Sequence, residues 1–390
     1  MKKFLKYIFN FNHLCVCIVT FAMLWLLKTI TFSLDILNPV ADAMENFSAA
    51  DIFFEIQHSG SEPEMSDIIT IVDMTELHDR GDIAMLFEEI NMNDPLLVGV
   101  DLIFEGVKDN HLGNELLEGA TMGLADKTIF STKLIEYNGE QEEFTGKVQS
   151  YFANDLGITE AYTNLKNDMT GALVREFSTK QTYNGEEMLS FPAKLAATFD
   201  ESLYSRGNED LLINYRNVEF PVVKWDEIAQ NSDLIEGHIV LVGTMTEEQD
   251  MHMTPLGKMP GLKVQAFSLL TLLEHKDIRK IPLWLTLVIA FIACYILELC
   301  FFASNRYIDK HPKSAFLTFA KESELTKLAT QFIFILATCW MSFMLFINNS
   351  ILLESNVIMA LLILLFEGDK VYYAIICAIA RKRESKEKIN

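Results

Sequence analysis

Cysteine is absent from residues 35–280 of this 390-residue sequence, and basic residues are scarce there. The segment holds 45 Asp and Glu against 17 Lys and Arg, a formal net charge of −28. Without cysteines it has no disulfide framework. Its negative charge argues against nucleic-acid binding, because the phosphate backbone would be repelled. The sequence also contains no Gly-rich phosphate loop, nucleophile elbow or zinc-protease motif. We therefore expect that the protein is not an enzyme and binds no cofactor.

The remaining residues have the opposite character. They hold 15 Lys and Arg against 9 Asp and Glu, together with all six cysteines. Half of the whole chain is hydrophobic and its mean hydropathy is +0.18, which is too apolar for an ordinary acidic water-soluble protein. The chain therefore combines an acidic soluble body with apolar, basic-flanked segments that we interpret as membrane spans.

Four apolar runs are predicted to cross the membrane, at residues 13–34, 281–303, 328–347 and 351–380. Excess Lys and Arg mark cytoplasmic segments, which indicates that the N-terminus and the loop after the second run lie inside. The order is then a cytoplasmic N-terminus (1–12), a first crossing (13–34), an exported body (35–280), a second crossing (281–303), a cytoplasmic loop (304–327), a third crossing (328–347), a fourth crossing that can extend into the cytoplasm (351–380) and a basic tail (381–390).

The first run also allows a second interpretation. Ala41-Asp42-Ala43 has the small-x-small form of a signal-peptide cleavage site, although it lies well beyond the apolar run. We expect a retained anchor, and both interpretations export the residues that follow.

The fourth run contains Glu367, Asp369 and Lys370 in its middle, and two registers are open. A span over residues 351–366 places these charges at the cytoplasmic interface. A span over residues 357–380 places them in the bilayer, where each costs roughly 2.5 to 3.5 kcal/mol unless it is paired. Glu367 and Lys370 are three residues apart and are expected to pair on one helical face. Glu298, in the second run, is expected to pair or snorkel, with a proton relay as the alternative.

The body alternates short β-branched runs with amphipathic stretches, which predicts an α/β domain with a largely parallel sheet. The polar segment 136–183 is expected to hold loops or an excursion from the sheet. The expected strands are 68–72, 96–104, 128–131, 211–215 and 239–242, and the expected helices are 83–90, 189–199 and 262–273.

An ordered set of short motifs resembles a known family. The motifs are Ile71-Val72-Asp73, Val98 to Phe104, Leu212 to Arg216, Ile239 to Gly243, Thr254 to Gly257 and Pro260-Gly261. In this order they resemble the second class of CHASE domains, which are extracytoplasmic bacterial sensor domains associated with cyclases and kinases. The layout of one helix, an exported α/β body and three closing helices is similar too.

The resemblance implies a sensor in the bacterial inner membrane, with its sensor domain in the periplasm or outside the cell. It also implies an unknown signal ligand and admits a homodimer. Two departures stand where a ligand would bind: residues 77–81 replace a stretch that bears Pro and Trp in the family, and Gln265 replaces a common His. Family members usually continue into a catalytic domain, and only ten residues follow Ala380 here, so a protein effector in trans is expected.

Candidate ligand-binding residues lie where strands are expected to end, because ligands of open α/β sheets bind at the carboxyl edge. Asp73, Asp101 and Glu105 would offer an acidic cluster for a divalent cation or an amine, or else cap helices and turns. Asn214 and Arg216 would present a hydrogen-bonding edge and a cation, unless the Arg pairs with an acid. The other candidates are Thr244 and Gln265. The loop 244–257 contains Glu247, Glu248, Asp250 and His252, whose acid and His content would suit a metal, but no ligand spacing is recognisable.

The sequence is compatible with three functions. The leading one is a membrane sensor that passes an extracytoplasmic signal to a separate partner. The alternative is an envelope assembly or scaffold subunit that uses the α/β body as a docking surface. Hydrolysis by the acidic cluster is disfavoured, because no His, Ser or Cys constellation accompanies the carboxylates.

Overall fold

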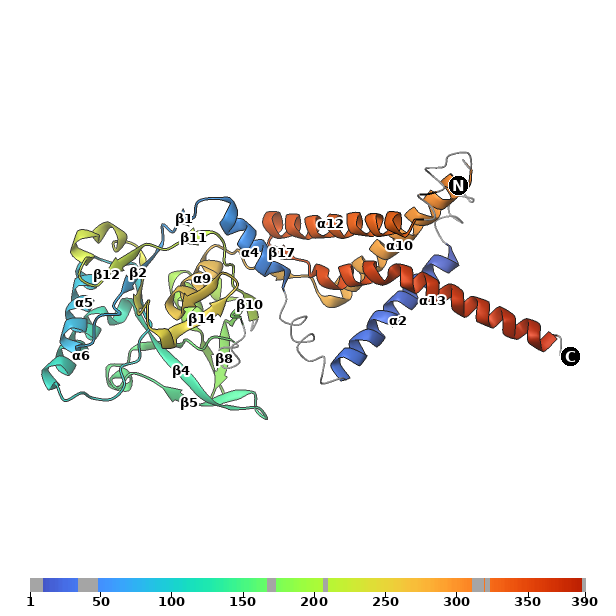
Figure 1. Cartoon of the computed structure of the whole chain (residues 1–390). Helices are drawn as coiled ribbons and strands as arrows, with labels where there is room; N and C mark the ends of the chain where they lie inside the picture. The colour runs from blue at the N-terminus through green and yellow to red at the C-terminus, as the bar shows by residue number, and fades with distance from the viewer. Residues whose placement is uncertain are drawn as a thin grey trace. The chain divides into compact units, whose positions relative to one another are not determined.

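The chain forms two compact units. The computed structural model describes residues 10–33, 48–166, 173–205, 210–310, 319 and 323–387 (Figure 1). One unit is the α/β domain, Asp51–Ile278, and the other is a helical bundle built from Met1–Ala50 and Arg279–Asn390. The proposed cleavage-site sequence at residues 41–43 lies outside the described residues.

A nine-stranded sheet forms the centre of the domain. Its strands are β2 (Ile69–Asp73), β3 (Leu97–Val100), β4 (Thr128–Asn138), β5 (Glu143–Val148), β6 (Thr159–Tyr162), β8 (Lys180–Tyr183), β9 (Glu186–Leu189), β12 (Val222–Lys224) and β13 (Ile239–Gly243). The order is β12-β2-β13-β3-β4-β5-β8-β9, and β6 also pairs with β4. The middle strands β2, β13 and β3 are almost fully buried, as expected for β-branched runs covered on both faces.

The sheet is mixed, so the prediction of a largely parallel sheet holds only for part of it. Strands β12, β2, β13, β3, β4 and β6 pair in parallel. Strands β5 and β9 run antiparallel to β4 and β8. The reason is that β4 is 11 residues long and continues beyond the parallel layer, where the chain turns after Asn138 and folds back as β5.

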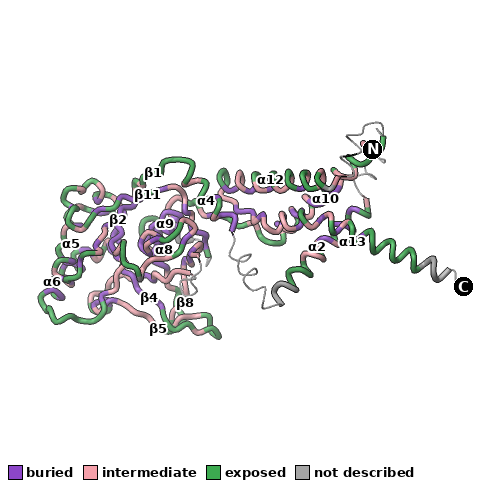
Figure 2. The backbone as a smooth tube through the Cα atoms, in the orientation of Figure 1, coloured by how far each residue is buried: buried purple, intermediate pink, exposed green. Residues whose placement is uncertain are grey.

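Helices cover both faces of the sheet. Helices α5 (Arg80–Met92) and α6 (His111–Leu124) pack on one face over a cluster that includes Phe87, Val98 and Val242. Helices α8 (Phe191–Phe199) and α9 (Gly261–Leu273) pack on the other face. Figure 2 shows the buried backbone concentrated along the sheet and these helices. The doubly covered sheet explains how the domain holds a large core without disulfides.

The predicted core elements are present, and the errors concentrate in the polar middle segment. The expected strand at 211–215 is shortened to β10 (Asp210–Leu212), which pairs with β7 (Glu176–Ser178) outside the main sheet. Segment 136–183 holds strands rather than loops alone. The smaller elements are α4 (Ala49–Gly60), β1 (Glu64–Met65), α7 (Ala153–Leu156), β11 (Val218–Glu219), β14 (Met251–Thr254), β15 (Gly257–Pro260) and 3₁₀ turns at Ala125–Lys127, Glu201–Ser205, Ile228–Gln230, Ser232–Leu234 and Glu248–Asp250.

In the part of the bundle that the structure describes there are four long helices and one short pair of strands. The helices are α2 (Phe11–Ser33), α10 (Leu283–Asp309), α12 (Glu324–Asn349) and α13 (Ser355–Glu387), and the strands are β16 (Arg279–Lys280) and β17 (Ile351–Leu352). The strands pair in parallel and lead directly into α10 and α13. The described cysteines are free and lie on these helices.

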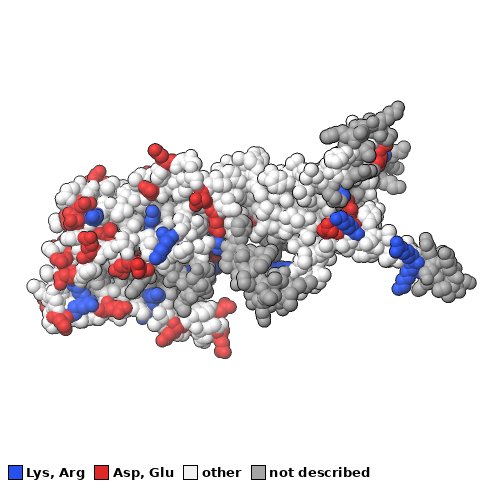
Figure 3. All heavy atoms as spheres, viewed as in Figure 1, with Lys and Arg blue, Asp and Glu red and all other residues white. Residues whose placement is uncertain are grey.

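Three helices in the described part of the chain are long and apolar enough to cross a membrane: Phe11–Thr29, Leu283–Asp309 and Leu325–Asn349. The predicted fourth crossing is therefore not confirmed. It falls on α13, whose apolar sequence is interrupted by Glu367, Asp369 and Lys370. Figure 3 shows the same division of charge, with Asp and Glu scattered over the visible face of the domain and few charges on that of the bundle.

Candidate functional site

A small polar cleft lies in the domain at the carboxyl edge of β3 and the N-terminal end of α9. Its volume is about 90 Å³. It is lined by Asp101, Lys133, Thr163, Asn164, Leu165, Asp250, His252, Gly261 and Gln265. The location agrees with the rule that ligands of open α/β sheets bind beyond the carboxyl ends of the strands.

Asp101 is the residue directly after β3, and its backbone N–H donates to the carbonyl of Val242 over 2.8 Å. Burial, and to a smaller extent the neighbouring carboxylate of Asp250, raise the pKa of the Asp101 carboxyl to about 7. His252 and a hydrogen bond from Ser131 act in the opposite direction. The Asp101 carboxyl therefore changes its charge near neutral pH.

The hairpin of β14 and β15 brings a second carboxylate to the cleft. His252 Nε2 lies 3.4 Å from Asp250 Oδ1, and the hairpin ends at Pro260, directly before Gly261 at the start of α9. A Cβ on Gly261 would lie only 2.6 Å from Asp250 Oδ1. Glycine at this position therefore allows the Asp250 carboxylate to lie against the start of α9.

The remaining walls are fixed by hydrogen bonds within the domain. Gln265, one turn into α9, is buried and donates from Nε2 to the carbonyl of Thr163 over 3.1 Å. Asn164 pairs with the backbone of Leu134 through both its amide oxygen and its amide nitrogen, at 2.8 Å each. These bonds hold the cleft in shape, whereas Asp101, Asp250 and the exposed Lys133 bring ionisable groups to it.

Of the seven candidate ligand residues, Asp101 and Gln265 line this cleft. Asp73 lies instead in a turn, where its Oδ1 accepts from the backbone N–H (3.0 Å) and the hydroxyl (2.5 Å) of Thr75. Glu105 is exposed, and its carbonyl accepts from the buried Arg80 guanidinium. Thr244 is partly buried and lies outside the cleft lining. The structure thus does not bring Asp73 and Glu105 to the cleft.

Asn214 and Arg216 lie beside the segment that follows α9 and connects the domain to β16. Asn214 Nδ2 donates to the carbonyl of Lys276 over 3.0 Å. Arg216 forms ion pairs with Glu64, at 3.2 Å, and with Glu274. Both side chains thus hold the segment that follows α9, and neither lines the cleft.

The acidic cluster expected for a divalent cation does not form. Among the described residues no group of three or more His, Cys, Asp or Glu side chains has an arrangement that would hold a metal ion. Asp250 and His252 belong to the acidic loop that the sequence suggested for a metal. In the structure both line the cleft described above.

The four charged residues flagged in the apolar segments have distinct environments within the bundle. Glu298 is buried and accepts from or donates to His13 Nδ1 across 3.1 Å. The predicted pair of Glu367 and Lys370 is confirmed, at 2.8 Å, and is exposed. Asp369 lies between Glu367 and Lys370 in the sequence. Its side chain is partly buried, and its Oδ1 atom is fully buried.

These features define a class of protein: an extracytoplasmic α/β sensory domain attached to apolar helices, in a membrane protein of signal transduction. The family model described as the CHASE2 domain matches residues 18–300, so the chain belongs to the CHASE2 domain family. The match confirms the resemblance inferred from the motifs. Searches of curated proteins and of solved structures find no match to this chain.

Proposed function

We propose that this protein is a multi-pass sensor of a bacterial inner membrane that binds a small polar ligand in the cleft at Asp101. In this proposal the domain lies on the extracytoplasmic side, and ligand binding shifts α9 and with it the helix that follows the domain. A separate protein partner receives the signal. A ligand can drive this change only to the extent that it binds one state more tightly than the other.

The observation that carries the proposal is the path of α9. The helix begins at the cleft, where Gly261 and Gln265 contribute to the lining, and ends at Leu273. Only the five residues 274–278 separate it from β16, and α10 begins at Leu283. The intervening segment is held by Asn214 and Arg216. A displacement at the start of α9 therefore has a short covalent route to α10.

The chemistry of the cleft favours a ligand with a cationic amine. Two carboxyl groups, Asp101 and Asp250, face it, and a protonated amine would form charge-assisted hydrogen bonds with them. Lys133 would accommodate an anionic group of the same ligand. Because the cleft measures about 90 Å³, far below the roughly 300 Å³ or more of drug-sized sites, the ligand must be small.

A fourth crossing by α13 completes the proposed topology. The parallel pair of β16 and β17 places Lys280 beside Leu352, and α10 and α13 each begin three residues later. Counted from these starts, Arg381 on α13 is level with Asp309 at the end of α10, where the basic flank of that helix lies. This register supports a span over residues 357–380, with Asp369 inside the bilayer. The described residues 373–382 are all exposed in the isolated chain and would contact lipid.

The variant Gly261→Ala tests the cleft. The new methyl group would displace the Asp250 carboxylate, which is the end of a flexible side chain, so we expect a small change in thermal stability. Affinity for a cationic ligand should fall about tenfold or more, equivalent to about 1.4 kcal/mol. The measurement is a thermal-shift and calorimetric titration of the full chain with a panel of amino acids, monoamines and short diamines.

Gly139→Ala serves as the matched control, because a Cβ at that turn meets nothing within 4 Å. It should bind as tightly as the wild type. If no compound of the panel binds the wild-type chain, or if Gly261→Ala binds as well as Gly139→Ala, the cleft is not the ligand site. Ligand-independent association with envelope proteins would then favour a scaffold.

A further inference from the structure

Three ionisable side chains from three helices of the bundle form a buried polar cluster. His13 on α2 and Glu298 on α10 are in contact at 3.1 Å, and their side chains are 4% and 10% exposed. Asp369 on α13 interacts electrostatically with His13. Two atoms of the cluster, His13 Nε2 and Asp369 Oδ1, are buried and make no hydrogen bond among the described residues. Such atoms are costly in an apolar bundle unless they bind something.

The strand pair at the start of the helices brings the two carboxyl groups to the same level. Glu298 lies 15 residues after the first residue of α10, and Asp369 lies 14 residues after the first residue of α13. At about 1.5 Å per residue, both are about 21 to 23 Å from the helix starts. Because β16 and β17 pair just before those starts, the two carboxyl groups lie at similar distances from the paired ends of the helices. Glu298 and Asp369 also interact electrostatically with each other.

Helix α2 is held close to this layer by two contacts with α13. Gly368 lies against Thr20, so closely that a Cβ on Gly368 would be 3.2 Å from the Thr20 Cα. The Tyr372 hydroxyl donates to Asn12 Oδ1 over 3.0 Å. These contacts lie on both sides of the sequence position of His13 and Asp369, so the cluster joins α2, α10 and α13.

The groups around the cluster leave it with few fixed charges. Helix α12 contributes Lys327, which interacts electrostatically with Asp369. Among the described residues, the other titratable groups near it are thiols and phenols. They are Cys17 on α2, Tyr295 on α10 and Tyr372 and Tyr373 on α13. The cluster has two carboxyl groups and one imidazole in an apolar layer. Binding or losing a single proton therefore determines which of these groups are charged and form an ion pair, and which are neutral.

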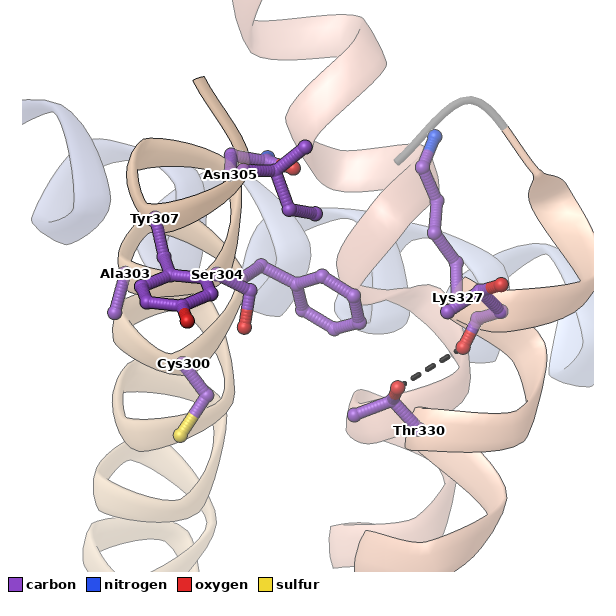
Figure 4. A pocket seen from close by; sticks show the side chains of 10 residues that line it. Cys300, Ala303, Ser304, Asn305, Tyr307, Lys327 and Thr330 are labelled. Atoms are coloured by element: carbon purple, nitrogen blue, oxygen red, sulfur yellow. Dashed lines mark hydrogen bonds between the residues drawn. The ribbon is translucent and has the colours of Figure 1, made fainter. Parts of the chain in front are cut away.

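A pocket lies between α10 and α12, and Lys327 is part of its lining. Its volume is about 600 Å³, and its lining includes Cys300, Ser304, Lys327 and Thr330 (Figure 4). Since Lys327 lines this pocket and also interacts with Asp369, the pocket reaches the neighbourhood of the cluster.

We propose that His13, Glu298 and Asp369 form a proton-binding site whose occupancy sets how α2 packs against α10 and α13. The proton comes from water and returns to it, and no other bond changes. The site goes beyond the ligand cleft of the domain and does not depend on it. Its occupancy would make the position of the helices before and after the domain depend on pH.

Infrared difference spectroscopy of the full chain in lipid nanodiscs, recorded as a function of pH, tests the proposal. The wild type should show the C=O stretch of a protonated carboxyl that titrates with pH. The band should shift or disappear in both Glu298→Gln and Asp369→Asn. Glu367→Gln is the matched control, because Glu367 is exposed and paired with Lys370, and it should leave the band unchanged.

A distance measurement that leaves the cluster intact covers the possibility that the variants fail to fold. Spin labels at the exposed positions Trp25 on α2 and Ile292 on α10, in a chain with its native cysteines replaced, report the packing of these helices. Their distance should change over the pH range in which the band titrates. A wild-type chain without a titrating carboxyl band, or a distance that is constant through that range, would overturn the proposal. Either result would leave ligand binding at Asp101 untouched.

Discussion

Replacing Asp101 with asparagine should stabilise the domain at pH 8 and abolish its affinity for a cationic ligand. The pKa of the Asp101 carboxyl is raised by burial to about 7, whereas an aspartate in an unfolded chain titrates near about 3.9. Below pH 4 the carboxyl is protonated in both the folded and the unfolded state, so it carries no buried charge and does not lower the free energy of unfolding. Between pH 4 and 7 the folded state retains the proton, and above pH 7 it bears a poorly solvated charge.

The stability of the wild type should therefore fall as the pH rises from 4 to 7, and that of Asp101→Asn should fall less. The full difference is up to about 4 kcal/mol, because a tenfold change in proton affinity corresponds to about 1.4 kcal/mol. Binding has the opposite dependence, since a protonated amine pairs with the ionised carboxylate. Affinity should rise as the pH passes 7 in the wild type and show no such rise in the variant.

Denaturant unfolding and calorimetric titration at pH 4, 6 and 8 measure both effects. Glu105→Gln is the control, because this carboxylate follows the same strand and is exposed. It should change neither stability nor binding. Equal pH profiles for the wild type and Asp101→Asn would show that the carboxyl is not held in a buried, ligand-facing state.

Replacing Gly368 with alanine should destabilise the helical bundle. A Cβ at this position would lie 2.1 Å from Thr20 Oγ1, 3.1 Å from Thr20 Cβ and 3.2 Å from Thr20 Cα. Since the obstruction includes the backbone of α2, the two helices must separate. Overpacking of this kind costs about 1 to 3 kcal/mol, and small residues are what allow helices to approach this closely in membranes.

Thermal unfolding of the full chain in detergent or nanodiscs should show this loss for Gly368→Ala. Adding Thr20→Ala removes the nearest obstructing atom, so the double variant should recover part of the stability, with a coupling energy of about 0.5 kcal/mol or more. Additive effects of the two substitutions would mean that α2 and α13 are not in contact at this position.

The ligand cleft could be predicted only in part. Asp101 was identified because it lies in the predicted strand 96–104, near its carboxyl end, and Gln265 because it stands where the resembled family commonly has a His. The roles of Asp250 and Gly261 were not predictable, since they depend on a hairpin that folds back onto the start of α9. Asn164 reaches the cleft from the polar middle segment, and Lys133 reaches it from the part of β4 just before that segment. The strands of the middle segment alternate too weakly to be recognised from the sequence.

In the bundle, too, only part of the polar contacts could be predicted from the sequence. The pair of Glu367 and Lys370 follows from helical spacing alone and was predicted. Asp369 lies between them in sequence and on a different side of the helix, and which side faces other helices depends on their packing. His13 and Glu298 are 285 residues apart, so no local pattern could have joined them.

The central claim is that ligand binding at the cleft is transmitted through α9 to α10. Hydrogen–deuterium exchange of the full chain, with and without a ligand found in the amine panel, tests it most directly. We expect slower exchange around Asp101 and Gly261, and a change that continues along α9 through residues 274–278 into the first turns of α10. Protection confined to the cleft, with α9 and α10 exchanging as before, would contradict the claim.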